Sequence, residues 1–123
     1  MKHTKIARKL FKWFSRHQKH DTTLKKSDIG HFFADSFLVN ANGKTYDANH
    51  DNYLEFLNQF RSTIRSISYT FGDFIEDESH VVVPLKAKIV RVDGSIENFE
   101  AILILKFNKE NKIILWHELY MRV

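Results

Sequence analysis

The sequence predicts an α+β domain in which N-terminal helices pack on a mostly antiparallel sheet. Apolar residues recur at helical spacing in segments 4–18 and 49–66, whereas the apolar period changes to two after Ser66. Helices that come first and long strands that come last are typical of this fold class. The chain has 123 residues, of which 43% are hydrophobic, so it has the size and composition of one domain with a core. We therefore expect a single domain spanning residues 1–123.

The first expected element is a basic amphipathic helix at about residues 4–18. Its apolar side chains form one broad stripe, and its basic side chains lie on the opposite face. We expect the stripe to cover the sheet and the lysines to face solvent. Attachment to a membrane surface, binding of a partner protein and a transit peptide are the alternative interpretations of this helix.

The positive charge of the chain is concentrated in the same segment. Residues 1–20 hold seven lysines and arginines and no acid, so the other 12 basic residues face all 15 acidic residues. The net charge of +4 therefore comes from the N-terminal segment, and the remainder is slightly acidic. A nucleic-acid-binding domain more often carries its basic face on the folded body, so we expect no nucleic-acid partner.

Two further helices and a tight turn follow along the chain. Residues 24–35 are expected to form the second helix, and Asn42-Gly43 is a strong signal for a tight turn. The third helix is expected at 49–66, where Asn49 or Asp51 can cap the first turn. Its apolar residues fall on one face, which is suited to packing against the sheet.

Extended segments make up the rest of the chain. A short one is expected at 37–39, and four long strands follow the third helix, at Ile67–Ile75, His80–Val92, Ile96–Phe107 and Ile113–Val123. Asp93-Gly94 is expected to form a two-residue hairpin turn. The strands are apolar on both sides, so the sheet face without helices is expected to contact a partner subunit.

The sequence also excludes several kinds of site. There is no cysteine, which excludes disulfides, thiolate nucleophiles and cysteine-ligated zinc and fits a cytoplasmic location. No apolar run has transmembrane length, so a membrane location is not expected. His17 and His20 have the spacing of metal ligands, but only Asp21 could support them, and we expect no metal and no cofactor.

Short motifs occur in a characteristic order, namely Phe32-Phe33-Ala34-Asp35, Asn42-Gly43-Lys44, the helix Asp51–Arg65, Val92-Asp93-Gly94, and Phe107–Ile113 with Trp116–Tyr120. In this order they resemble the nuclear transport factor 2-like superfamily, which includes SnoaL-like proteins and ketosteroid isomerases. The resemblance covers nearly the whole chain. It implies a cone-shaped fold with a curved, mixed, mostly antiparallel sheet, a pocket between sheet and helices, and commonly a homodimer through the outer sheet face.

The resemblance implies no single reaction, because the superfamily includes isomerases, cyclases, dehydratases, epoxide hydrolases and non-catalytic proteins. Ketosteroid isomerases place a carboxylate base a few residues after the Phe-Ala-Asp motif, where this chain has Asn40-Ala41-Asn42. They place a protonated aspartate on the penultimate strand, where this chain has Leu103, and a tyrosine on the first helix, where it has none. The usual isomerase mechanism is therefore not expected.

Strand register predicts which side chains share a face of the sheet. Counting outward from a two-residue turn at Asp93-Gly94 pairs Lys86 with Ala101, and counting across the next turn places Ala101 opposite Glu118. The small alanine would let the Lys86 and Glu118 side chains meet over it. An ordinary ion pair on a solvated face is the alternative interpretation of these two residues.

The predicted pocket is built around the last strand. The resemblance places Leu103 and Trp116 on the pocket face. Glu118 is the best catalytic candidate, as a general base or as a hydrogen-bond partner of a ligand hydroxyl or amine. Lys86 would lower the pKa of Glu118, whereas burial would raise it. The expected ligand-binding residues are Trp116, Tyr120, Lys86, Leu103, Tyr53 and Asp73.

A different register would reverse the faces of the second long strand. A one-residue bulge at Asp93-Gly94 would send Lys86 and Lys88 outward and would turn three apolar residues towards the pocket, namely Leu85, Ala87 and Ile89. In the favoured register, the outer face is the expected homodimer surface and consists of Leu85, Ile102, Ile104, Leu115, His117 and Leu119.

Two functions from different classes fit these expectations. The first is a SnoaL-like protein that binds an apolar small molecule in its pocket, with a lyase, isomerase or cyclase reaction as an extension. The alternative is a non-catalytic homodimeric interaction module whose cavity is filled by phenylalanine and tryptophan side chains. The 11 phenylalanines favour a cavity that is filled by aromatic side chains, whereas a charged Glu118 favours an open and hydrated pocket.

Overall fold

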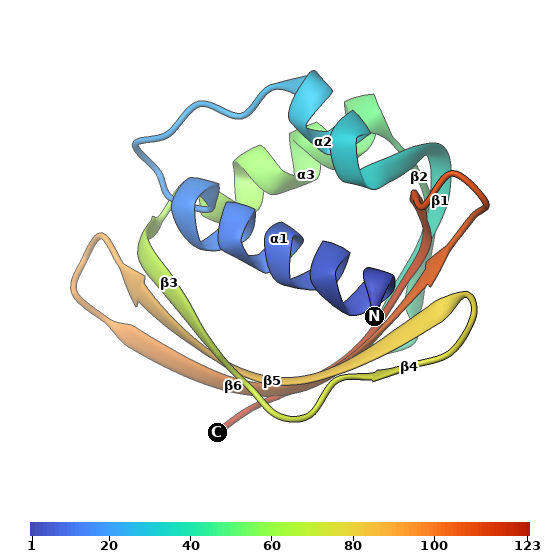
Figure 1. Ribbon diagram of the computed structural model, residues 1–123. Helices are drawn as coiled ribbons and strands as arrows, with labels where there is room; N and C mark the ends of the chain where they lie inside the picture. The colour runs from blue at the N-terminus through green and yellow to red at the C-terminus, as the bar shows by residue number, and fades with distance from the viewer.

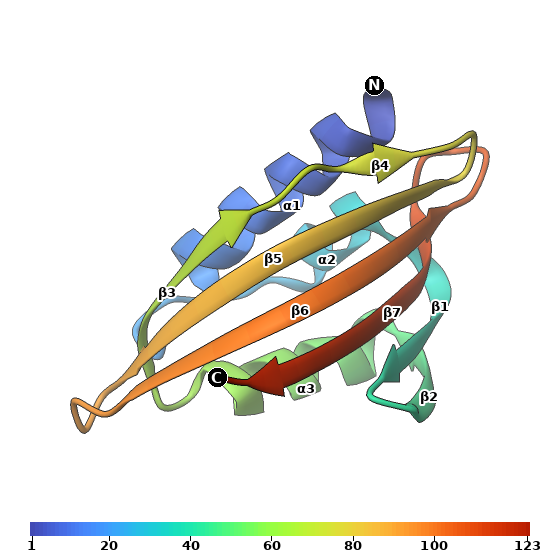
Figure 2. The same ribbon diagram turned by 90° about the horizontal axis from the view of Figure 1, so that it is seen from below.

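Three helices lie on the concave face of a strongly curved sheet in the computed structural model, which describes residues 1–123 (Figure 1). The elements are α1 (Lys2–His17), α2 (Lys26–Phe32), β1 (Phe33–Ala41), β2 (Lys44–Asn49), α3 (His50–Arg61), β3 (Ile64–Phe71), β4 (Ile75–Glu76), β5 (His80–Arg91), β6 (Ile96–Phe107) and β7 (Ile113–Arg122). The seven-stranded sheet has the order β2-β1-β7-β6-β5-β3, and β4 pairs with β5. No helix covers its convex face (Figure 2).

The predicted α+β class with a mixed, mostly antiparallel sheet is confirmed. Strands β1 and β7 are parallel, and the other paired strands are antiparallel. The parallel pair is possible because α3 and the strands that follow it lie between β1 and β7 in the chain, which leaves ample length for the crossover.

Helix α1 lies across β3 and β5 (Figure 1). Its apolar stripe is buried towards the sheet. Ala7, Leu10 and Phe14 are buried on this stripe, whereas the basic residues of the opposite face are mostly exposed. The N-terminal turn is held by Glu76 of β4, whose Oε1 accepts hydrogen bonds from the backbone N–H of Thr4 at 3.2 Å and from its hydroxyl at 2.7 Å. No helix is both long and apolar enough to span a membrane.

Helix α3 begins at a capping box. The Asn49 side chain accepts a hydrogen bond from the N–H of Asn52, and the Asn52 side chain accepts one from the N–H of Asn49, both at 2.9 Å. Asn49 is therefore the cap, and not Asp51. The helix ends at Arg61, earlier than predicted, because Ile64 already begins β3 and is fully buried.

The segment between α2 and α3 contains more strand than the sequence indicates. Helix α2 ends at Phe32, because Phe33 begins β1 and is buried opposite Ile113 of β7. Strand β2 is not predicted, because it is short, mostly polar and forms an edge of the sheet. Asn42 and Gly43 form the predicted two-residue turn between β1 and β2, with φ angles of 52° and 85°.

The turn between β5 and β6 corrects the predicted register. Gly94 N–H donates to the carbonyl of Arg91 at 3.0 Å, Arg91 N–H donates to the carbonyl of Ser95 at 2.8 Å, and the φ angle of Gly94 is 88°. This is a three-residue loop with a glycine bulge, not a two-residue turn. Lys86 therefore pairs with Glu100 instead of Ala101, so the predicted register is wrong and the bulged alternative is correct.

The pairing of β6 with β7 differs from the prediction by an even number of residues. The turn places Phe107 opposite Ile113, and a bulge beside it then places Leu103 opposite Glu118. The expected partner of Leu103 was Trp116, two positions earlier. Because side chains alternate with a period of two, this shift leaves Trp116 and Glu118 on the concave face.

The core fills much of the space between the helices and the concave face. Its fully buried members include Leu10 of α1, Leu57 of α3 and Leu105 of β6. Aromatic rings from both layers meet there, as Phe14 of α1 does with Trp116 of β7 at a centroid separation of 5.7 Å. These rings fill only part of the space, and a cavity remains beside them.

Candidate functional site

A cavity of about 460 Å³ lies between the concave face and the helices α1 and α3. Its wall is apolar, since 17 of its 20 lining residues are hydrophobic. Three of them are alanines of the sheet, Ala41, Ala87 and Ala101, each flanked by strands that carry larger side chains. Small side chains at these positions leave room that the helices do not fill. The cavity therefore follows from the sequence of the strands.

Glu118 is the only acidic side chain on this wall. It projects from β7 between Leu103 of β6 and Ala41 of β1, so its neighbours in the sheet are apolar. Its Oε1 accepts one long hydrogen bond, from the indole Nε1–H of Trp116 at 3.4 Å. Burial raises the pKa of the Glu118 carboxyl, and the Trp116 hydrogen bond opposes this rise.

Two tyrosines line the cavity with Glu118, Tyr53 buried and Tyr69 partly buried. Burial raises the pKa of the phenols of Tyr53 and Tyr69, and the negative charge of Glu118 adds to both shifts. Both phenols therefore keep their protons and can donate hydrogen bonds. The ring of Tyr69 packs on that of Phe11 of α1, and the ring of Tyr53 packs on that of Phe33 of β1, with a centroid separation of 4.9 Å in each pair. These contacts hold the tyrosine rings in place.

Gln18, directly after α1, is a second polar group in the cavity wall. The residue is 5% exposed, and its side-chain Oε1 has no hydrogen-bond partner. A buried amide oxygen without a partner is uncommon in folded proteins. Sequence reasoning missed this residue, because a glutamine at a helix end carries no signal of burial.

Arg91 also lines the cavity, but its charge is already compensated. Its Nη2 lies 2.6 Å from Oε1 of Glu97, and its Nη1 donates to the hydroxyl of Thr63 at 3.0 Å. Its position could not be expected from the predicted register, because the glycine bulge determines which face Arg91 occupies.

The structure brings most of the predicted site residues together. Trp116, Glu118, Tyr120 and Tyr53 line the cavity. Leu103 lies on the same face, fully buried beside Glu118 and behind the cavity wall.

Besides Leu103, two predicted site residues do not line the cavity, and both of these lie away from it. Lys86 is on the convex face, with its Nζ 3.9 Å from Oε1 of Glu100, because the three-residue turn reverses the faces of β5. Asp73 is exposed, because β3 ends at Phe71 and the chain leaves the sheet before Asp73. The predicted contact between Lys86 and Glu118 is therefore wrong.

No group of three or more histidines, aspartates and glutamates lies close enough together to hold a metal ion.

The fold is similar to that of several solved proteins, although the sequence identities are low. The epoxide hydrolase/cyclase-like enzyme SalBIII, described in pyran ring formation in the polyether salinomycin, gives a TM-score of 0.78 at 14% identity over 98% of this chain and 91% of its own. A nuclear transport factor 2-like protein from Anabaena variabilis gives 0.76 at 14% identity over 96% of this chain and 88% of its own. Another nuclear transport factor 2-like protein, of unknown function, from Burkholderia pseudomallei gives a TM-score of 0.73 at 15% identity over 96% of this chain and 89% of its own.

No protein-family model matches the sequence, and no curated protein matches it. The structural similarities extend over nearly the whole chain and include the order of helices and strands. The chain therefore has the nuclear transport factor 2-like fold that the order of its motifs indicates.

Proposed function

We propose that this chain binds an apolar small molecule in the cavity and that Glu118 contacts the polar group of the ligand. One observation carries the proposal, namely that a lone carboxyl group projects from a wall that is otherwise almost entirely apolar. Glu118 is partly buried, so its carboxyl group loses much of its hydration, and the single 3.4 Å bond from Trp116 replaces only part of it. A ligand hydroxyl or amine beside Glu118 would supply the missing hydrogen bonds.

The same carboxyl group is the candidate for acid–base chemistry in the cavity. Burial raises its pKa, which brings it closer to the range in which it can both accept and donate a proton near neutral pH. SalBIII is described as epoxide hydrolase/cyclase-like. A lyase, isomerase or cyclase reaction in this chain would use Glu118 to move the proton, and ligand binding is the part of the function that the geometry supports best.

A fluorescence titration with the neutral apolar probe N-phenyl-1-naphthylamine tests the proposal. We expect saturable binding of one probe molecule per chain, with a blue-shifted emission from the apolar cavity. The control is the double variant Ile102→Ser and Leu119→Ser, which alters the convex face and leaves the cavity unchanged. Equal affinity in the control supports the cavity. Absence of saturable binding, or its loss in the control variant, would contradict the proposal.

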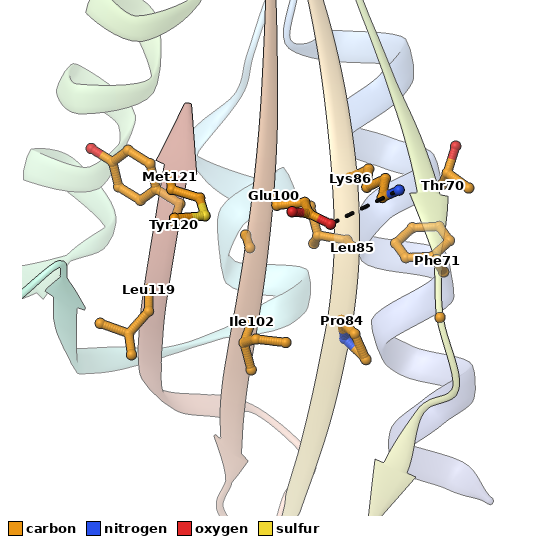
Figure 3. A pocket seen from close by; sticks show the side chains of 12 residues that line it. Thr70, Phe71, Pro84, Leu85, Lys86, Glu100, Ile102, Leu119, Tyr120 and Met121 are labelled. Carbon is orange, nitrogen blue, oxygen red and sulfur yellow. Dashed lines mark ion pairs between the residues drawn. The ribbon is translucent and has the colours of Figure 1, made fainter. Parts of the chain in front are cut away.

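We also propose that the chain forms a homodimer through its convex face. Ile102, Leu119 and Met121 are 48%, 59% and 60% exposed there. They line a groove of about 700 Å³, the convex groove, with Pro84, Lys86 and Glu100 (Figure 3). A contiguous apolar area of this kind is typical of an association surface. Of the residues expected on this surface, Leu85 borders the convex groove but is only 7% exposed, because the corrected register turns its side chain to the concave face.

Light scattering coupled to gel filtration tests the homodimer. The wild-type chain is expected to have twice the mass of one chain, and Ile102→Lys is expected to shift it towards the monomer, because a charge would be buried without a partner. Ile75→Lys is the matched control, since Ile75 is 65% exposed on the short strand β4, away from the convex groove. A wild-type monomer, or equal masses for the two variants, would contradict the homodimer.

A further inference from the structure

We infer that the ligand of this cavity is an organic cation, that is, an apolar molecule carrying a protonated amine or a quaternary ammonium group. The inference rests on the proposed function and specifies its ligand class. Four features of the cavity support it. They are the absence of a basic partner for Glu118, the ion pair that Arg91 forms with Glu97, the aromatic rings around the carboxyl group, and the side-chain oxygen of Gln18, which has no hydrogen-bond partner.

Glu118 has no basic partner within the protein. The sequence suggests Lys86 as its counter-ion, but Lys86 lies on the convex face and pairs with Glu100 at 3.9 Å. Arg91 is the only basic residue on the cavity wall, and it is bound to Glu97 and Thr63. Glu118 is partly buried, and a carboxylate that has lost much of its hydration is normally accompanied by a cation, because its desolvation is costly. The position of that cation is therefore open to a ligand.

Aromatic rings surround the space next to this carboxyl group. Phe11 contacts both Trp116 and Tyr69, with ring centroids 6.3 Å and 4.9 Å apart, and all three rings line the cavity. Tyr53 lines it from α3. The faces of such rings attract ammonium groups, and the attraction is strongest where water is excluded. An aromatic enclosure that also holds a carboxylate provides both parts of a cation site.

The polar atoms of the wall add hydrogen-bond acceptors for such a ligand. The Gln18 Oε1 is buried and unpartnered, so it can accept an N–H from the ligand without losing another bond. A carboxylate ligand finds no free cation on this wall and would be repelled by Glu118. A neutral alcohol can bond to Glu118 but leaves its charge uncompensated. The expected order of affinity is therefore amine, then alcohol, then carboxylate.

Isothermal titration calorimetry with three ligands that share one carbon skeleton tests this order of affinity. The probes are 4-phenylbutylamine, 4-phenylbutan-1-ol and 4-phenylbutyrate, compared near neutral pH. We expect the amine to bind at least about tenfold more tightly than the alcohol, and the carboxylate to bind more weakly than both. In Glu118→Gln the preference for the amine is expected to disappear, whereas the affinity for the alcohol stays within about threefold. Glu100→Gln, the matched control on the convex face, is expected to retain the wild-type order.

The outcomes separate this inference from the proposed function. If the alcohol binds as tightly as the amine, or if Glu118→Gln retains the preference, the organic-cation inference is overturned. Binding of N-phenyl-1-naphthylamine would still support the proposed function in that case. If the neutral fluorescent probe and all three ligands fail to bind, both proposals are overturned. If Glu118→Gln does not fold, the order of the three affinities measured on the wild-type chain decides the inference by itself.

Discussion

Replacing Ala41 with phenylalanine is expected to weaken binding of N-phenyl-1-naphthylamine by about a hundredfold or more, which corresponds to about 2.7 kcal/mol. Ala41 is the β1 neighbour of Glu118 across the parallel strand pair, and it lines the cavity. A phenyl ring at this position would occupy the space beside the carboxyl group. The strand would tolerate the change, because aromatic residues are favoured in strands and the new ring enters a space that is not filled.

The matched control for this variant is Leu38→Phe, which adds a ring to the same strand. Leu38 is 39% exposed and pairs with Leu115, so it lies on the convex face. Its substitution is expected to leave probe affinity unchanged. Both variants should retain the wild-type circular dichroism spectrum. Unchanged affinity in a folded Ala41→Phe protein would show that the probe binds elsewhere.

The second prediction concerns the free energy of unfolding as a function of pH. Burial raises the folded-state pKa of Glu118 above the ordinary glutamate pKa of about 4.3 in the unfolded chain. Between these two pKa values the folded state binds more protons than the unfolded state. The contribution of Glu118 to stability is therefore fully present below the unfolded pKa, and it is lost as the pH rises through the raised folded pKa.

Urea denaturation of Glu118→Gln over a pH series checks this sign. Glutamine stays neutral, so the variant is expected to become more stable than the wild type as the pH rises, by an amount on the order of 1 kcal/mol at neutral pH. Glu100→Gln is the control, and its difference from the wild type is expected to be small at every pH, because the Glu100 side chain is 49% exposed. A Glu118→Gln protein less stable than the wild type at neutral pH would mean that the carboxylate has a stabilising partner.

The main elements of the fold could be predicted from periodicity. The apolar stripe of α1, the Asn49 cap of α3 and the bounds of β6 agree with the sequence-based expectation. Strand β2 could not be predicted, because its residues are mostly polar and its pairing with β1 depends on tertiary context. The ends of α2 and α3 were predicted too late, since Phe33 and Ile64 satisfy either a helical or an extended pattern and burial in the sheet decides between them.

A strand register that is wrong by an even number of residues still places each side chain on its predicted face of the sheet, whereas an odd error reverses the faces. The candidate site could therefore be predicted only on strands whose register error is even. The β6–β7 register was displaced by two residues, and Trp116 and Glu118 still share the concave face. The β5–β6 register was displaced by one residue, and Lys86 changed face. A turn of two residues and a three-residue turn with a glycine bulge are both compatible with Asp93-Gly94, so the sequence alone leaves the choice open.

Other parts of the site had no signal in the sequence at all. Gln18 is polar and follows a helix, which ordinarily places a residue in solvent. Ala41 was noted only as part of a segment without a carboxylate base, and its importance as the open space beside Glu118 depends on the pairing of β1 with β7. The homodimer and the cytoplasmic location stay predictions.

A crystal structure of the chain with 4-phenylbutylamine would show directly whether the cavity binds an organic cation at Glu118. We expect the ligand inside the cavity, with its nitrogen about 2.8 Å from a carboxylate oxygen of Glu118 and its phenyl ring among the aromatic side chains of the wall. A ligand bound instead in the convex groove beside Lys86 and Glu100, or a cavity closed by its own side chains with no ligand density, would contradict this prediction.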